Sequence, residues 1–120
     1  MSPPMAASRR IVRIAKNQAM FRVVNERITA WPERQAAPAA EKLVFYCECA
    51  DQHCFDHVHL TAREYEAIRA DSTRFVVAAG HVFPEAERVV AQPDGYEVVE
   101  KNEDLRRILE RIDPRKGAYS

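Results

Sequence analysis

Apolar residues recur at helical spacing in the first third of the chain, three or four positions apart, with mostly polar residues between them. The pattern predicts an amphipathic helix over residues 17–31, in which Asn17 is a candidate N-cap and a start as early as Arg9 fits the same periodicity. Pro32 cannot continue a helix and ends it. The apolar side of this helix is expected to pack on the core, and it consists of Phe21, Val24, Ile28 and Trp31.

The middle of the chain alternates between short β-rich runs and turn residues. The runs KLVFYCEC, which starts at Lys42, and HVHLT, which ends at Thr61, predict two strands that pair around the intervening loop. In TARE, Thr61 precedes Glu64 by three positions, the spacing of a capping box at the start of a short helix that ends near Asp71. RFVVAAG predicts a third strand, and the sequence PDG between ERVVAQ and YEVVEK predicts the turn of a further β-hairpin.

A second amphipathic helix is predicted near the end of the chain, capped by Asn102, stopped by Pro114 and apolar at Leu105, Ile108, Leu109 and Ile112. Together the elements predict an α+β fold: a small mixed or antiparallel sheet with a hairpin around the cysteines, flanked by N- and C-terminal amphipathic helices. The predicted division is a basic flexible arm over 1–16, the first helix over 17–31, a linker over 32–42, an α+β domain with the C-terminal helix over 43–113, and a tail over 114–120.

The composition is that of one soluble globular domain, with 120 residues, 47% of them hydrophobic and 30% charged. No apolar run is long enough to cross a bilayer, and the first residues lack the uncharged core of a secretion signal, so we expect a cytoplasmic protein. Residues 1–25 contain five basic residues and no acid, although the chain has zero net charge. A basic arm can bind phosphate groups, so a nucleic-acid binder is one alternative and a solvated helix face is the other. The residues concerned are Arg9, Arg10, Arg13 and Lys16.

All three cysteines of the chain lie within CECADQHC. Alternate side chains of a strand share a face, so Cys47 and Cys49 would point the same way and Glu48 the opposite way. The residues ADQH then allow the chain to turn back and bring Cys54 to the same point. Three thiolates gathered in this way suit one Zn²⁺ per chain, because zinc takes sulfur and nitrogen ligands in a tetrahedron. A reducing compartment makes a disulfide framework the weaker interpretation.

The fourth ligand has to come from outside the three cysteines. His81 follows Gly80 at the end of a predicted strand, where a glycine turn can aim the imidazole back at the thiols, and it is the preferred candidate. His57, three positions after the last cysteine, is the local alternative. His53, His59, an acidic residue or water remain as further options, and His59 is also placed to donate a hydrogen bond to a ligand.

A Cys₃His shell has no open position for water, so the zinc would be structural. The protein is then expected to be a non-enzymatic binding or regulatory module with an unidentified protein partner. The sequence also lacks a phosphate-binding loop, a dinucleotide-binding glycine pattern and a metalloprotease helix motif. Three alternatives stay open. The thiols could form a redox sensor that releases zinc on oxidation, they could be inert buried residues, or one could be a nucleophile paired with His57 or His81 and oriented by Asp51 or Asp56.

Four segments, FRVVNERI, FYCECADQHC, LTAREYEAIRADSTRFVVAAGH and PEAERVVAQPDGYEVVEK, follow one another in an order that resembles an uncharacterised family of small bacterial proteins. The resemblance covers about residues 17–101 and includes the CxC-x4-C pattern and the later glycine–histidine pair. It implies a metal-ligand set of Cys47, Cys49, Cys54 and His81, and it implies no activity. The family pattern is expected to carry proline before the glycine, where this chain has Ala79, so a less rigid loop is implied here.

Overall fold

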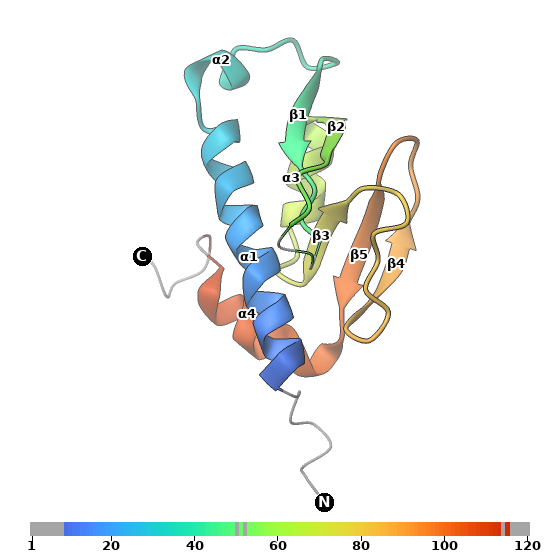
Figure 1. Ribbon diagram of the computed structural model, residues 1–120. Coiled ribbons are helices and arrows are strands. Elements are labelled where there is room, and N and C mark those ends of the chain that lie inside the picture. The colour runs from blue at the N-terminus through green and yellow to red at the C-terminus, as the bar shows by residue number, and fades with distance from the viewer. Residues whose placement is uncertain (1–8, 50, 52, 114, 116–120) are drawn as a thin grey trace, which may run out of the picture.

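The computed structural model describes residues 9–49, 51, 53–113 and 115, and helices and short strands alternate along them (Figure 1). The α+β fold expected from the sequence is confirmed. The elements in chain order are α1 (Arg9–Thr29), α2 (Pro32–Gln35), β1 (Lys42–Tyr46), β2 (His57–Thr61), α3 (Ala62–Arg69), β3 (Arg74–Val77), β4 (Glu87–Ala91), β5 (Glu97–Lys101), the 3-10 turn η1 (Glu103–Leu105) and α4 (Arg106–Ile112).

The strands form two separate antiparallel sheets rather than one. β1 and β2 pair over their full length, so that Leu43 lies opposite Leu60 and Phe45 opposite Val58. In the second sheet β5 lies between β3 and β4. The chain changes sheets because β2 leads directly into α3, which carries it away from the hairpin before β3 begins.

Two predictions about local structure are confirmed. Thr61 Oγ1 accepts a hydrogen bond from the Glu64 N–H at 3.1 Å, and the Glu64 carboxylate accepts one from the Thr61 N–H at 2.7 Å, so a capping box starts α3. β4 and β5 form the predicted hairpin, and in its turn Gly95 takes a φ of 90°, which favours glycine. A β-bulge between Val89 and Ala91 shifts the register within this hairpin.

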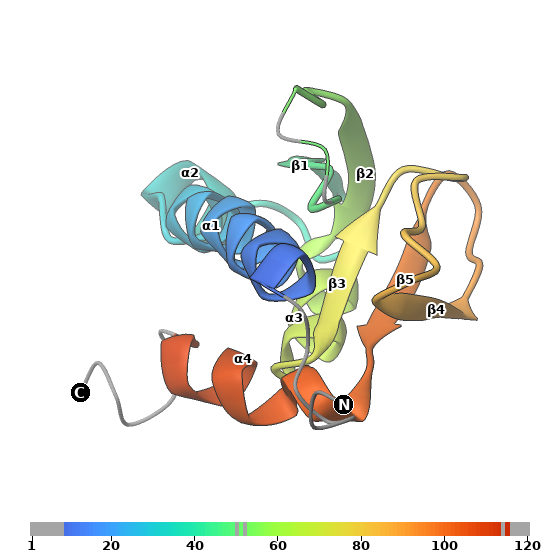
Figure 2. The same ribbon diagram turned by 60° about the horizontal axis from the view of Figure 1, so that its bottom comes forward.

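The core consists of two clusters of buried side chains. Figure 2 shows the helices α1 and α4 to the left of the three-stranded sheet. The first cluster lies between the three-stranded sheet and the helices α1 and α4, and it contains Phe75, Leu109 and Cys47. Leu109 is fully buried, as predicted for the apolar stripe of the C-terminal helix. The second cluster lies among β1, β2, α3 and β3, around the stacked rings of Phe45 and Tyr65, whose centroids are 4.5 Å apart.

The helix α1 (Arg9–Thr29) begins at Arg9, the early start that the helical periodicity also allowed. A flexible arm was predicted over residues 1–16, but residues 9–16 are helical. The reason is that this segment contributes to the core, where Ala15 is fully buried. Residues 1–8, the rest of the predicted arm, lie outside the described residues.

The segment predicted to be a linker over residues 32–42 contains the one-turn helix α2. Pro32 opens this helix, at a position where a missing N–H costs no intrahelical hydrogen bond. Of the predicted tail over residues 114–120, the structure describes only Arg115. Its guanidinium donates hydrogen bonds to Glu26 of α1 at 2.6 and 2.7 Å, so this residue contacts the folded domain.

From Gln18 to Asn25 the buried side of α1 is mainly polar, and the prediction that the stripe of Phe21, Val24, Ile28 and Trp31 packs on the core was wrong. Gln18, Arg22 and Asn25 are at most 1% exposed, whereas Val24 is 39% and Trp31 is 55% exposed. The reason is that each buried polar side chain has a hydrogen-bond partner on a distant element, which no periodicity reveals. Gln18 donates to Glu87, Arg22 donates to the backbone carbonyls of Ser72 and Arg74, and Asn25 donates to Glu48 and to the carbonyl of Tyr46.

A buried ionic cluster holds α1, α3 and the end of α4 together. Asp113 accepts hydrogen bonds from Arg69 and from the Ser72 hydroxyl, both at 2.7 Å, and its carboxylate lies 3.6 Å from Arg22. Arg22 also lies over the ring of Phe75, 3.7 Å from its centroid. Burial works to raise the pKa of Asp113, but the hydrogen bonds from Arg69 and Ser72 outweigh it and lower that pKa from 3.8 to about 2.

Candidate metal centre

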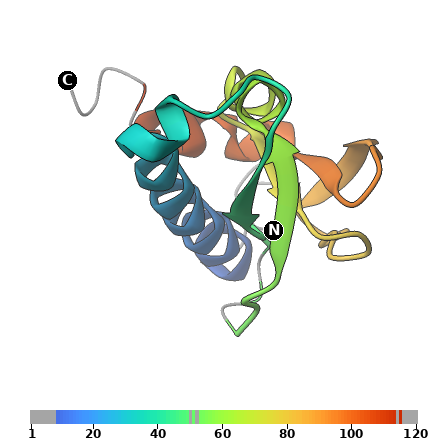
Figure 3. The same ribbon diagram turned by 90° about the horizontal axis from the view of Figure 1, so that it is seen from above.

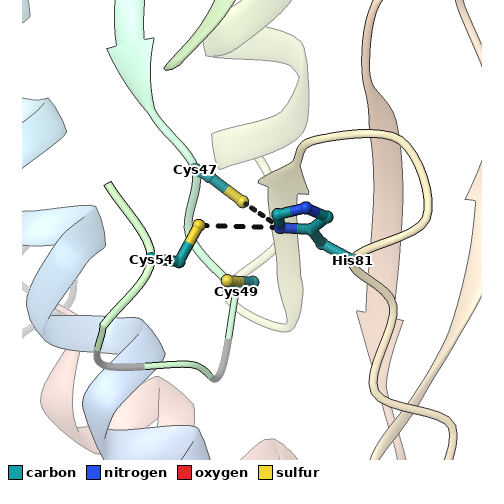
Figure 4. A group of neighbouring side chains, drawn as sticks. All are labelled: Cys47, Cys49, Cys54 and His81. Carbon is teal, nitrogen blue, oxygen red and sulfur yellow. Dashed lines mark hydrogen bonds between the residues drawn. The ribbon is translucent and has the colours of Figure 1, made fainter. Parts of the chain in front are cut away.

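Cys47, Cys49, Cys54 and His81 come from three segments that meet where the two sheets approach each other (Figure 4). The first two cysteines follow β1, the third precedes β2, and the histidine lies in the turn after β3. The strand predicted to run through both cysteines ends before them. The hairpin nevertheless positions Cys47, because its N–H donates to the carbonyl of Asp56 at 2.9 Å.

The ligand atoms of these four residues form a tight group, all within 4.8 Å of one another. Nδ1 of His81 lies 3.6 Å from Sγ of Cys47 and 3.6 Å from Sγ of Cys54. An ion with tetrahedral bonds of about 2.3 Å to sulfur and about 2.0 Å to nitrogen would hold such atoms about 3.5 Å apart. The group therefore has the size and the composition to hold one metal ion.

A glycine turn aims His81 at the thiols, as the sequence predicted. Gly80 has a φ of 84°, and the N–H of His81 donates to the carbonyl of Ala78 at 3.0 Å, which closes the turn. The second ring nitrogen, Nε2, lies 3.4 Å from Oδ2 of Asp56. A carboxylate in this position orients the ring and leaves Nδ1 facing the thiols.

Hydrogen bonds within the group shift the pKa values of Cys47 and Cys49 in opposite directions. The N–H of Ala78 donates to Sγ of Cys47 at 3.1 Å. The thiol of Cys47 donates to Cys49, which lowers the pKa of Cys49 to about 5. The same hydrogen bond, together with burial, raises the pKa of Cys47. Because a metal ion requires thiolates, its binding has to displace the protons that the group still shares.

Glu48, the residue between the first two cysteines, is fully buried, and its hydrogen bonds fix the backbone next to the site. Glu48 accepts hydrogen bonds from Asn25 at 2.8 Å, from the Tyr65 hydroxyl at 2.9 Å and from the N–H of Val76 at 3.0 Å. Its own N–H donates to the carbonyl of Val76 at 2.8 Å, which joins the end of β1 to β3. Burial raises the pKa of Glu48, although Arg22 and the three donors favour the ionised form.

The remaining histidines lie away from the thiols. His53, His57 and His59 are exposed, and the ring of His57 packs edge-on against Tyr46 with 5.0 Å between centroids. Among the described residues, the thiol group has one histidine within ligand distance, and that histidine is His81. The local alternative, His57, is therefore not brought to the cysteines.

A cavity of about 580 Å³ opens beside Cys49 and His81. Arg10 and Arg13 line it, so part of the basic cluster identified in the sequence lies near the thiol group. Arg10 is also held by an ion pair with Glu85. The other two residues of the basic cluster, Arg9 and Lys16, are exposed on α1.

Sequence reasoning identified the four residues of the thiol–imidazole group but not the groups that support them. The buried carboxylate of Glu48, the N–H of Ala78 and the hydrogen-bond partners on α1 have no local sequence signal, because each depends on a contact between distant segments. Asp56 was considered only as a turn residue or as a catalytic orienter, and the structure instead places it behind His81.

None of the helices among the described residues combines the length and the hydrophobicity needed to cross a lipid bilayer. The resemblance to small bacterial proteins stays an expectation. Compared with known proteins, the chain matches no family model, no curated sequence and no solved structure.

Proposed function

We propose that the chain binds one structural Zn²⁺ through Cys47, Cys49, Cys54 and His81, and that it acts as a non-enzymatic binding or regulatory module. The observation that carries this proposal is the convergence of the four ligand atoms within 4.8 Å. Three thiolates and one imidazole favour zinc over magnesium and calcium, because those harder cations take oxygen ligands.

A structural role follows from the number and the burial of the ligands. Four protein ligands complete a tetrahedron and leave no position for the water molecule that a catalytic zinc activates. Cys47 and Cys49 are only 1% and 3% exposed, so the ion would be shielded from solvent on their side. The Ala78 N–H and the Asp56 carboxylate would support the sulfur and imidazole ligands from outside the coordination shell.

The ion would connect the two sheets. The three thiols belong to the β1–β2 hairpin, and His81 follows β3 of the second sheet. In zinc-finger peptides, bound zinc contributes about 10 kcal/mol or more of folding free energy at neutral pH. Here two small clusters would be held in one arrangement by a single ion, so its removal is expected to loosen the contact between the hairpin and the second sheet.

Metal analysis of the purified protein tests this proposal. We expect one zinc ion per chain in the wild type and loss of that zinc in Cys49→Ser. His57→Ala is the matched control, because His57 neighbours the cysteines in sequence but lies outside the group; it should retain the ion. Replacement by Co²⁺ should give sulfur-to-cobalt charge-transfer bands in the wild type and weaker bands in Cys49→Ser. A folded wild type that binds neither zinc nor cobalt would overturn the proposal.

A further inference from the structure

One side of α1 and the turn after it carry apolar side chains that no other described element covers. Met20, Val24 and Trp31 are 65%, 39% and 55% exposed, and Phe21 and Ile28 beside them are half-buried. At about 100° per residue, Met20 and Val24 lie more than a quarter turn away from the buried polar face, and Phe21 and Ile28 lie between them and that face. We call these five residues the α1 stripe. Figure 3 shows α1 along one edge of the molecule.

The apolar surface continues from α1 onto the loop that carries the cysteines. A groove of about 210 Å³ is lined by Phe21 and Val24 of α1, by Tyr46 of β1 and by Phe55. Phe55 is 69% exposed, although it directly follows the ligand candidate Cys54. The exposed patch is therefore built by two elements and is wider than the helix alone.

We propose that the α1 stripe is the interface of a homodimer in which two copies of α1 pack antiparallel. The stripe positions Phe21, Val24, Ile28 and Trp31 are separated by three, four and three residues. The alternation of three and four is that of a seven-residue repeat, the pattern of a seam between two like helices. Phe21, Val24 and Ile28 lie on α1, and Trp31 lies just after its end. A two-fold axis beside such a seam buries the same residues on both chains, as an isologous interface requires.

The exposed area is sufficient for a weak dimer. At the roughly 150–250 Å² that an aromatic side chain offers, the exposed fractions of Met20, Val24, Trp31 and Phe55 correspond to at most about 450 Å² per chain. Two copies would bury about 900 Å², the size of a weak or transient interface. We therefore expect a dissociation constant of about 10 μM rather than a permanent dimer.

The charge distribution along α1 favours the antiparallel arrangement. The first turns contain Arg9, Arg10, Arg13 and Lys16 and no acidic residue. Parallel packing would bring these cations beside their own copies, which costs energy. Antiparallel packing with the axis near Val24 and Ile28 instead places the two basic ends at opposite ends of the interface, about 30 Å or more apart at 1.5 Å per residue. In that arrangement Trp31 of one chain lies opposite the partner's Phe21.

Light scattering after size-exclusion chromatography tests the dimer with the full chain. At about 100 μM, well above the expected dissociation constant, the wild type should have a mass approaching twice 13.7 kDa. Val24→Glu should have the mass of one chain, because it places a carboxylate in the seam. Ala67→Glu, which adds the same charge at an exposed position of α3, is the matched control and should remain dimeric.

Tryptophan fluorescence gives a second readout, because Trp31 is the one tryptophan of the chain. Its emission should shift to shorter wavelength as the wild-type concentration rises and should stay constant for Val24→Glu. Zinc content is measured on the same samples, and Val24→Glu keeps all four ligand residues, so loss of the dimer and loss of the metal are separate outcomes. A monomeric wild type at the higher concentration, or equal masses for the two variants, would overturn the proposal.

Discussion

The imidazole of His81 lies between the thiols and the carboxylate of Asp56. Its Nε2 atom is 3.4 Å from Oδ2 of Asp56, while its Nδ1 atom faces the sulfur atoms of Cys47 and Cys54 at 3.6 Å. The backbone carbonyl of Asp56 also accepts the hydrogen bond from the N–H of Cys47. One aspartate thus contacts two of the four candidate ligands, His81 through its side chain and Cys47 through its backbone.

The first prediction concerns that carboxylate. Asp56→Asn keeps the backbone contact but replaces the anion that orients the imidazole, and we expect the zinc affinity to fall about tenfold. Competition with a chromophoric chelator measures the affinity. Asp94→Asn, in the exposed turn between β4 and β5, is the matched control and should bind zinc like the wild type. Equal affinities for the two variants would show that Asp56 does not support the metal.

The second prediction concerns Glu48. Glu48→Ala removes the acceptor for Asn25, Tyr65 and the N–H of Val76, and it leaves a cavity where the carboxylate was. Each unpaired buried donor costs about 1–3 kcal/mol, so we expect the free energy of unfolding to fall by at least about 3 kcal/mol. Urea denaturation measures it. Glu110→Ala, which removes a half-exposed carboxylate on α4, should cost less than about 1 kcal/mol.

The third prediction concerns the pH dependence of stability. The folded pKa of Asp113, about 2, lies below its ordinary value of 3.8. Its contribution to the free energy of unfolding is therefore complete above about pH 5, is lost as the pH falls towards 2, and amounts to about 2 kcal/mol. The difference in unfolding free energy between the wild type and Asp113→Asn should shrink over this range. Both proteins would lose metal in acid, so the difference between their unfolding free energies reports on the Asp113 carboxylate alone. A difference that stays constant from about pH 5 to about pH 2 would contradict the low pKa of Asp113.

The fourth prediction concerns removal of the metal. Chelation should increase amide hydrogen exchange in the β1–β2 hairpin and at Ala78, whose N–H donates to Cys47, because the contact between the sheets loosens. The central strand β5, paired on both sides, serves as the internal reference and should keep more of its protection. Exchange that is unchanged throughout the chain would show that the ion does not join the two sheets.

The thiol–imidazole group could be predicted from the sequence because its signals are local. The spacing of Cys47 and Cys49 indicated that they share one side, although β1 ends before them. The short loop returns Cys54, and Gly80 supplies the turn before His81. The capping box at Thr61 and the turn around Gly95 identified α3 and the β4–β5 hairpin for the same reason. These patterns depend on neighbours a few positions apart, and such neighbours are visible in the sequence.

The orientation of α1 could not be predicted, because it depends on distant partners. Periodicity identifies the apolar side of a helix, but it does not say which side the rest of the chain will cover. Arg22 is buried because the carbonyls of Ser72 and Arg74 accept its hydrogen bonds and because Asp113 lies nearby. These contacts outweigh the preference to bury Val24, and they appear only when the tertiary structure is known.

The ligands are divided unequally along the chain, and this has a consequence for the order of assembly. Three thiols lie close together in sequence, whereas His81 is 27 positions beyond Cys54. If the proposed zinc binds, the thiols could hold it early, whereas His81 could complete the ligand set only after the intervening chain has formed α3 and β3. A complete set of four ligands would therefore require that the hairpin and the second sheet have reached their final relative position.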